Sequence, residues 1–351
     1  MQKTLSCAII GCGVIAPSHA SGYRKIPGVR LRWACDLVEE KARALARRYE
    51  IEKTTRDYRD VLADPAVDAV SICTDHASHA EIAVAALDAG KHVLCEKALA
   101  ATPEGLDSMI AAGDRHPELV FSGVFQHRFD RVHQYVKRLI EGGAFGTLLT
   151  ASFKVLCLRT DAYYLADQWR GTWDREGGSV MINQAIHYVD LLQWMTGGVS
   201  SLSAAHSNLT HAQSIETEDT AVAVLKLRNG ALGSMLATSS SHLTWDPSLF
   251  FYGSDGSLEL RNGKPLRAVF TDADRTREVN AELAELNDAA RNEAGKDYYG
   301  PSHPTQIADF VAAIREGRPP FVTARAARAA VDIVLAIYRS HREGRWIAIA
   351  S

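Results

Sequence analysis

Short apolar runs alternate with helical stretches through the first 125 residues, and this alternation constrains the fold more than any other feature of the sequence. The runs are apolar at every position rather than at every second one, so both faces of each predicted strand are buried. Strands of this kind, separated by helices, form a parallel sheet with helices on both sides, a doubly wound α/β domain. The predicted strands are 5–10, 29–35, 67–73, 92–95 and 119–125, and the predicted helices are 16–26, 38–49, 81–89 and one that begins after Thr102.

The pattern changes after about residue 145, where strand-like segments follow one another with turns such as Arg228-Asn229-Gly230 between them. Strands in a row without intervening helices indicate an antiparallel arrangement, here a large, open and mostly antiparallel sheet in an α+β domain. We therefore predict a first domain at 1–125 and a second at 126–351, with closing helices that pack back toward the first. The predicted strands are 147–158, 202–209, 220–227, 232–239, 249–252 and 257–260, and the helices are 179–195, 275–293, 303–315 and 324–342.

Charge and composition exclude several classes of protein. The chain has 39 Lys and Arg against 42 Asp and Glu, a net charge of −3, which argues against a nucleic-acid partner because phosphate contacts need clustered basic residues. It has no apolar run long enough to span a bilayer and begins without a secretory signal, so we predict a cytoplasmic protein with no membrane partner. The six cysteines lack metal-site spacing and are expected to be reduced thiols in the core, so no metal is predicted.

A glycine-rich turn directly follows the first strand and opens the first helix. Gly11 suits a tight turn, Gly13 lets a pyrophosphate approach the backbone, and Ala16 lets the helix pack closely on the strand. Phosphates bind favourably at a helix N-terminus, so we predict a dinucleotide site here rather than a merely structural turn. The predicted cofactor contacts in this turn are Gly11, Cys12, Gly13, Val14 and Ile15.

The second strand ends at Asp36, 25 residues after Gly11. A carboxylate at this position accepts hydrogen bonds from the adenosine ribose and repels a 2′-phosphate. Because no basic residue follows before Lys41, NAD is favoured over NADP. The alternative is a solvated aspartate that caps the next helix.

Polar residues also follow two later strands. Thr74, His76 and His79 lie in a predicted loop after the third strand, where ligands of open α/β sheets bind, although such histidines are often only solvated. Glu96 and Lys97 follow the next strand. Lys97 is placed to polarise a substrate hydroxyl or to shuttle its proton, and the alternative is a surface ion pair.

The helix predicted at 179–195 carries Asn183, His187 and Asp190 on one face of an otherwise apolar sequence. A polar stripe on a buried helix needs partners or a ligand, although a satisfied core histidine is the commoner case. Upstream, Tyr164, Trp169 and Arg170 lie in a span rich in aromatic and polar residues. Aromatic rings stack on sugars and an Arg pairs with carboxylate or phosphate, but the tryptophans also suit packing between domains.

The sequence resembles the Gfo/Idh/MocA family of sugar and cyclitol oxidoreductases. The resemblance rests on five segments that span the chain, which are 89–93 with Glu96-Lys97, 125–129, 169–170 with Gly177-Gly178, 183–190 and 303–310 with 316–320. Three positions depart from the family's usual pattern. Ala98 and Asp75 stand where proline is usual, and Asn183 stands where many members have an aspartate that tunes the following histidine.

The resemblance implies an NAD-dependent oxidoreductase that oxidises a hydroxyl of a sugar or nucleotide-activated sugar, including a uronic acid. It implies Lys97 and His187 as catalytic residues. It adds Gln126, Trp169 and Arg170 to the cofactor contacts, beside Asp36, Thr74, His76, His79, Glu96 and Lys97. The implied substrate contacts are Lys97, Tyr164, Arg170, Asn183 and His187.

Several alternatives remain open at this point. The alternative substrates of such an enzyme are an inositol or a free aldose, and the alternative direction is reduction of a keto-sugar. A glycosidase that uses NAD transiently is a further enzyme class, and an NAD-sensing regulator on the same fold is not an enzyme. The presence of both Lys97 and His187 argues against the regulator, which needs no proton-transfer pair. The open sheet of the second domain predicts a homodimer or homotetramer.

Overall fold

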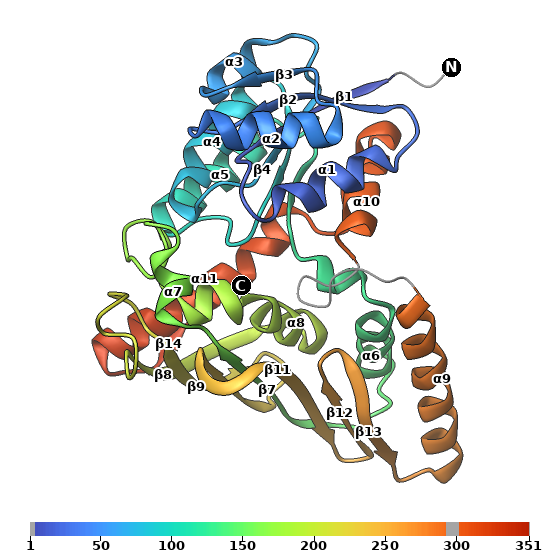
Figure 1. Ribbon diagram of the computed structural model, residues 1–351. Coiled ribbons are helices and arrows are strands. Elements are labelled where there is room, and N and C mark those ends of the chain that lie inside the picture. The colour runs from blue at the N-terminus through green and yellow to red at the C-terminus, as the bar shows by residue number, and fades with distance from the viewer. Residues whose placement is uncertain (1–3, 293–301, 351) are drawn as a thin grey trace. The chain divides into compact units, whose positions relative to one another are not determined.

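Figure 1 shows the computed structural model, which describes residues 4–292 and 302–350. The chain divides into two compact units. Residues 1–126 with 302–328 form the first, and residues 127–301 with 329–351 form the second, so the division falls within helix α11 (Ala324–Glu343). The last residue of the helix predicted at 275–293 lies outside the described residues.

The sheet of the first unit consists of six parallel strands in the order β3-β2-β1-β4-β5-β6. Every residue of β1 and β4 is buried, which confirms that the continuous apolar runs are strands covered on both faces. The order reverses between β1 and β4, so this is the doubly wound arrangement predicted from the sequence. The strands are β1 (Leu5–Ile10), β2 (Val29–Cys35), β3 (Lys53–Thr55), β4 (Ala69–Ile72), β5 (His92–Cys95) and β6 (Phe121–Gly123).

The helices of the first unit pack in two groups, α1 with α2 and α10, and α4 with α3 and α5 (Figure 1). Thr102 begins α5 as predicted, because its side chain accepts a 3.1 Å hydrogen bond from the N–H of Gly105 and a proline follows. Helix α10 comes from far along the sequence and packs on α1, where Ile307 lies against Gly22. The helices are α1 (Ala16–Arg24), α2 (Glu39–Tyr49), α3 (Tyr58–Ala63), α4 (His76–Asp88), α5 (Pro103–Arg115) and α10 (His303–Glu316).

One prediction in this unit was wrong. The segment with His76 and His79 is not a loop but the first turn of α4, which begins five residues before the predicted start at 81. The reason is the N-cap, since the carboxylate of Asp75 accepts hydrogen bonds from the N–H of Ser78 at 3.1 Å and from its hydroxyl at 2.7 Å. These bonds satisfy the first turn of a helix whose apolar pattern starts only later.

The second unit has an eight-stranded sheet in the order β13-β12-β11-β7-β10-β9-β8-β14. Its neighbours are antiparallel except β7 and β10, which are parallel, so the sheet is mixed and mostly antiparallel. The sequence missed β13 and β14. The strands are β7 (Leu148–Leu158), β8 (Val199–Ser207), β9 (Thr220–Leu227), β10 (Leu232–Thr238), β11 (Ser240–Gly253), β12 (Gly256–Arg261), β13 (Lys264–Phe270) and β14 (Ile347–Ala348).

One face of this sheet is covered by a π-helical turn, η2 (Val180–Gln184), and the helix α8 (Ile186–Thr196). The strand β9 shows the asymmetry, because its buried residues alternate strictly with exposed ones. The helix predicted at 179–195 therefore exists, but its first turn is a π-turn in which the N–H of Ala185 bonds to the carbonyl of Val180. The remaining helical segments are η1 (Gln126–Phe129), α6 (Arg131–Glu141), α7 (Asp161–Leu165) and α9 (Ala273–Asn292).

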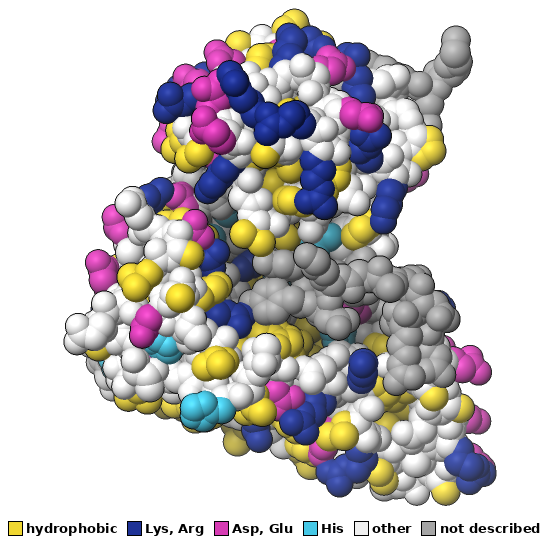
Figure 2. Space-filling view, in the orientation of Figure 1, with side chains coloured by type: hydrophobic (Ala, Val, Ile, Leu, Met, Phe, Trp, Pro, Cys, Tyr) yellow, Lys and Arg dark blue, Asp and Glu magenta, His cyan; other side chains and the backbone are white. Residues whose placement is uncertain are grey.

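Charged side chains of both signs are interspersed around α2 and α3 on the face shown in Figure 2. Many of them form exposed ion pairs, such as Arg43 with Glu39 at 2.5 Å and Arg24 with Glu50 at 2.8 Å. All six cysteines are buried, as predicted, and burial raises the pKa of Cys12 and of Cys35 to about 12. Among the described residues, no helix is both long enough and apolar enough to cross a membrane.

Candidate active site

The carboxyl ends of four parallel strands meet at one edge of the first unit's sheet. The N–H of Gly11, after β1, bonds to the carbonyl of Cys35 on β2 at 2.8 Å. The N–H of Cys73, after β4, bonds to Ile10 at 2.7 Å, and that of Glu96, after β5, bonds to Ile72 at 3.0 Å. The predicted cofactor residues Gly11, Asp36, Thr74 and Glu96 thus follow neighbouring strands at the point where the strand order reverses.

Two glycines of the phosphate loop have different reasons to be glycine. Gly11 has φ +90°, and a Cβ there would lie 2.5 Å from the carbonyl carbon of Cys73, so the protein itself requires glycine. A Cβ on Gly13 would meet no atom within 4 Å. The space over Gly13 is therefore open, at the start of a helix whose N-cap residue, Ile15, supplies no side-chain cap. An uncapped helix start beneath an open glycine fits a pyrophosphate.

Asp36 is fixed against this loop by two hydrogen bonds. Its Oδ2 accepts from the N–H of Cys12 at 2.8 Å and its Oδ1 from the N–H of Val38 at 2.8 Å. Its sequence neighbours Leu37 and Val38 are exposed and apolar, and the guanidinium of Arg56 lies beside them, with its Nε donating to the carbonyl of Leu37 at 3.0 Å. Each carboxylate oxygen keeps a second lone pair for a ribose hydroxyl, which fits NAD.

The residues after β4 lie at the same edge of the sheet, and their side chains contact other groups of the protein. The hydroxyl oxygens of Thr74 and Ser78 are 2.8 Å apart, and Thr74 is only partly buried. His79 is fully buried, with Nδ1 2.8 Å from the carbonyl of Ala98 and Nε2 3.2 Å from that of Thr74. Burial lowers the pKa of His79, and the ring braces the backbone through these two contacts. The ring of His76 lies beside it, 5.8 Å between centroids. Cofactor contacts by these two histidines stay predictions.

Glu96 and Lys97 point into different surroundings. Glu96 is 5% exposed, and its Oε1 is 2.9 Å from Nε2 of His19 on α1 and 3.7 Å from Nε2 of His303 on α10. Burial favours the neutral acid, but the two imidazoles outweigh it and hold the pKa of Glu96 well below its usual range. Glu96 is thus a buried anchor between helices, whereas Lys97 is only partly buried.

In the second unit, Asn183 and His187 stand out by their exposure. From residue 176 to residue 192 every side chain is buried except these two. They lie one turn apart, in η2 and α8, so they reach the surface at the same place. Asp190, predicted to share their face, is buried and forms a bidentate pair with Arg128, at 2.7 Å and 2.5 Å.

A buried glutamate orients Asn183. Oε1 of Glu176 accepts a 2.5 Å hydrogen bond from the amide of Asn183, and its Oε2 accepts one from the N–H of Gly171. The amide nitrogen of Asn183 is therefore directed at Glu176, and this bond fixes the orientation of the amide. Glu176 was not predicted, because one acidic residue before a glycine pair carries no periodic signal.

A second buried glutamate holds the start of this segment. Both carboxylate oxygens of Glu218 lie 3.1 Å from the N–H of Ser179, and Oε1 also accepts from the N–H of Met181 and the hydroxyl of Tyr338. Burial raises the pKa of Glu218 to about 7 in spite of these donors. Glu218 thus supports the π-turn that carries Asn183.

The aromatic span predicted to meet the substrate has mixed surroundings. Tyr164 is 2% exposed, and its hydroxyl donates to Ser239 at 2.8 Å, so this residue packs inside the unit. The guanidinium of Arg170 lies 4.2 Å from the ring centre of Tyr163 and 5.2 Å from that of Trp169, and its Nε bonds to Asp167 at 2.9 Å. Substrate or cofactor contacts by Tyr164, Trp169 and Arg170 stay predictions.

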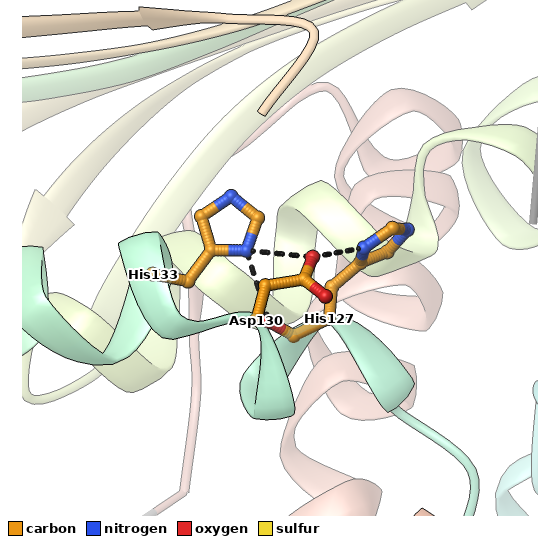
Figure 3. Close-up of side chains that lie close together, drawn as sticks. All are labelled: His127, Asp130 and His133. Carbon is orange, nitrogen blue, oxygen red and sulfur yellow. Dashed lines mark hydrogen bonds and ion pairs between the residues drawn. The ribbon is translucent and has the colours of Figure 1, made fainter. Parts of the chain in front are cut away.

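A cluster of side chains from η1 and the start of α6 lies beside this helix. Figure 3 shows His127, Asp130 and His133, with Oδ2 of Asp130 between the two rings, 2.7 Å from Nδ1 of His127 and 3.2 Å from Nδ1 of His133. The ring of His127 also meets that of His187 edge to face, with centroids 5.1 Å apart. In the sequence, His127 stands out only as part of a segment of family resemblance, and Asp130 was not predicted, although a carboxylate three residues after a histidine is a recognisable pair.

Comparison with known proteins places the chain in a family. One family model, described as the oxidoreductase family's NAD-binding Rossmann fold, matches residues 5–124, and the family's C-terminal alpha/beta domain matches residues 137–349. The WlbA dehydrogenase of Bordetella pertussis, solved in complex with NADH and UDP-GlcNAcA, has a TM-score of 0.89 at 29% identity over 99% of each chain. Myo-inositol 2-dehydrogenase of Thermotoga maritima is 27% identical over 97% of each chain. Levoglucosan dehydrogenase of Pseudarthrobacter phenanthrenivorans is 27% identical over 86% of this chain and 82% of the relative.

Proposed function

The chain belongs to the Gfo/Idh/MocA family of oxidoreductases, and on this premise we propose that it oxidises a secondary hydroxyl of a sugar or nucleotide-activated sugar. Its first unit is the family's NAD-binding Rossmann fold, so the reaction is NAD-dependent. The observation that carries the proposal is the pair Asn183 and His187, the two side chains that reach the surface from an otherwise buried segment. A polar pair brought out of a core in this way is a site for a ligand.

The chain's own residues bind the cofactor and move one proton. The loop at Gly13 and the start of α1 bind the pyrophosphate, and Asp36 accepts hydrogen bonds from the adenosine ribose. NAD supplies the acceptor for the hydride that leaves the carbinol carbon. Nζ of Lys97 contacts the reacting oxygen, and the ring of His187 receives the hydroxyl proton, so a C–H and an O–H bond break as the carbonyl forms. The Oδ1 of Asn183 accepts a hydrogen bond from a neighbouring hydroxyl.

We favour a nucleotide-linked sugar, including a uronic acid, as the substrate class. The support is the likeness to the WlbA dehydrogenase, whose structure was solved in complex with NADH and UDP-GlcNAcA. The two chains match over 99% of their lengths at 29% identity. Arg170 offers a guanidinium held over two aromatic rings, which suits a carboxylate or phosphate. The second candidate is a cyclitol, since myo-inositol 2-dehydrogenase matches 97% of this chain.

Two further proposals concern domain roles and assembly. We propose that residues 1–125 act as the NAD-binding domain and residues 126–351 as the substrate-binding and oligomerisation domain. The outer face of the second unit's sheet carries exposed Val222, Val224 and Leu232, and such an apolar face supports a homodimer or homotetramer. A cytoplasmic location stays a prediction.

The test is absorbance-monitored reduction of NAD against UDP-linked sugars, uronic acids, inositols and free aldoses, each repeated with NADP. We expect one substrate class to be oxidised with NAD, and we expect that class to be the UDP-linked sugars and not the inositols. Turnover on inositols alone would replace the first substrate class by the second. If NADH binds but no substrate in the panel is oxidised, the proposed oxidation of a sugar hydroxyl is wrong.

A further inference from the structure

The contact between His127 and His187 links the proposed proton acceptor to a carboxylate. The two rings meet edge to face at an interplanar angle of 88° and a centroid separation of 5.1 Å. Nδ1 of the same His127 ring is 2.7 Å from Oδ2 of Asp130 (Figure 3). His127 therefore contacts both the carboxylate of Asp130 and the ring of His187.

The carboxylate is held in this place from a second side. Nδ1 of His133 is 3.2 Å from the same Oδ2 of Asp130 and 2.9 Å from the carbonyl oxygen of His127. Because both of these neighbours are acceptors, the hydrogen-bond network assigns the proton of His133 to Nδ1, which makes this ring a donor. His133 is 1% exposed, so it is a buried support that fixes the direction of the carboxylate.

Asp130 carries a full negative charge at this position. Burial favours its neutral form, but the facing His127 and His133 outweigh burial and hold the pKa of Asp130 below its usual range. Titratable groups that face the pair include Tyr188, whose pKa is raised by burial and then by Asp130, and His187 itself. Arg128 is taken up by Asp190 in a bidentate pair, so its cation is compensated.

The placement of Asp130 is not explained by the helix that it begins. It occupies the N-cap position of α6, yet its side chain makes no capping hydrogen bond. An aspartate that served the helix would accept from the second or third N–H of the first turn. Here the carboxylate turns instead toward the rings of His127 and His133.

The negative charge of Asp130 matters for the reaction because Asn183, one turn before His187, is a neutral amide. A proton that arrives on His187 creates an imidazolium, and a neutral amide four residues away does not stabilise it by charge. We propose that Asp130 is a positioning residue for the reaction: acting through the ring of His127, it supplies the negative charge that stabilises the imidazolium formed at His187. This inference rests on the proposed function, in which His187 receives the hydroxyl proton.

The test compares the pKa of His187 in the wild type and in four variants, without substrate. Histidine Cε1–H resonances are followed by NMR over a pH titration, and the resonance of His187 is assigned by its loss in His187→Gln. Asp130→Asn and Asp130→Ser both remove the charge, and the serine keeps a residue that begins helices well. The controls are His133→Gln, which loosens the carboxylate but leaves its charge, and Glu141→Gln, which removes an exposed carboxylate from the same helix.

We expect both Asp130 variants to lower the pKa of His187 by about one pH unit, because a nearby negative charge favours the imidazolium. The two controls are expected to leave it within a few tenths of a unit. An unchanged pKa in a folded Asp130 variant, or an equal fall in His133→Gln, would overturn the inference. Circular dichroism establishes which variants fold, and the serine variant serves if the asparagine variant does not.

Turnover separates this inference from the proposed function. In Asp130→Ser, we expect kcat/KM to fall about tenfold at neutral pH, with the acidic limb of its pH profile moved to lower pH. A wild-type protein that oxidises no sugar refutes the proposed function, whereas the NMR titration still measures the coupling of Asp130 to His187. If the pKa of His187 falls as expected in Asp130→Ser but turnover is unchanged, the coupling exists and its role in the reaction is refuted.

Discussion

Replacing Gly13 by alanine tests whether this glycine is needed for cofactor binding and not for the stability of the protein. A Cβ at Gly13 meets no atom within 4 Å, and the backbone there lies outside the left-handed region. The substitution therefore adds no strain, and its effect on the free energy of unfolding is expected to stay within about 1 kcal/mol and to be stabilising if anything. The added methyl group stands where the pyrophosphate approaches the loop, so NADH binding is expected to weaken at least about tenfold, or ~1.4 kcal/mol.

Gly11 is the matched comparison, two residues away. A Cβ at Gly11 lies 2.5 Å from both the carbonyl carbon and the oxygen of Cys73, and φ is +90°. The left-handed conformation alone costs an alanine about 1–2 kcal/mol, and the close contact adds to it. We expect Gly11→Ala to lower the stability of the whole domain, as well as cofactor binding.

The assay is a dissociation constant for NADH by titration calorimetry, with a thermal midpoint for each variant. Gly13→Ala is expected to keep the wild-type midpoint and lose affinity, and Gly11→Ala to lose both. If Gly13→Ala binds NADH as tightly as the wild type, the open space over this glycine is not the pyrophosphate site. If Gly13→Ala is as unstable as Gly11→Ala, the reasoning from the contacts is wrong.

Three further predictions follow from single side chains. Asp36→Asn keeps an acceptor for the backbone but removes the charge, so the preference for NADH over NADPH in binding is expected to fall about tenfold; an unchanged ratio of the two dissociation constants would contradict the role of Asp36. The pKa of Glu218 is raised to about 7 from 4.5 by burial, so its contribution to folding is complete below pH 4.5 and is lost as pH rises through 7. Urea denaturation is expected to show this loss, up to about 3 kcal/mol, in the wild type but not in Glu218→Gln, and an equal pH dependence in both would refute it. Val224→Lys places a charge on the apolar sheet face and is expected to lower the mass measured by light scattering, whereas an unchanged mass would exclude that face as the interface.

The sequence predicted the parts of the fold that have a clear period. The continuous apolar runs of β1 and β4 and the strict alternation of β9 are visible in the sequence, because burial on two faces or on one face leaves a direct pattern. The start of α4 was misplaced because a single N-cap bond from Asp75 outweighs the polar composition of the first turn. The parallel pairing of β7 with β10 depends on contacts between distant segments, which composition does not encode.

Residues of the candidate site were predictable from the sequence where a polar or titratable side chain occurs at a regular spacing. Asn183 and His187 were found because they interrupt an apolar run at helical spacing, and they are the two side chains that reach the surface there. Glu176, Glu218 and Asp130 were missed. Each acts through a hydrogen bond to a segment that is not its neighbour in a periodic pattern, so only the folded chain places them.

The most direct test of the central claim is the activity of Lys97→Met beside the wild type, with NADH binding measured on the same samples. We expect the wild type to reduce NAD in the presence of its sugar substrate, and the variant to keep most of its affinity for NADH but to show no turnover. Full activity in Lys97→Met would contradict the account, because the lysine proposed to contact the reacting oxygen would then take no part in the reaction.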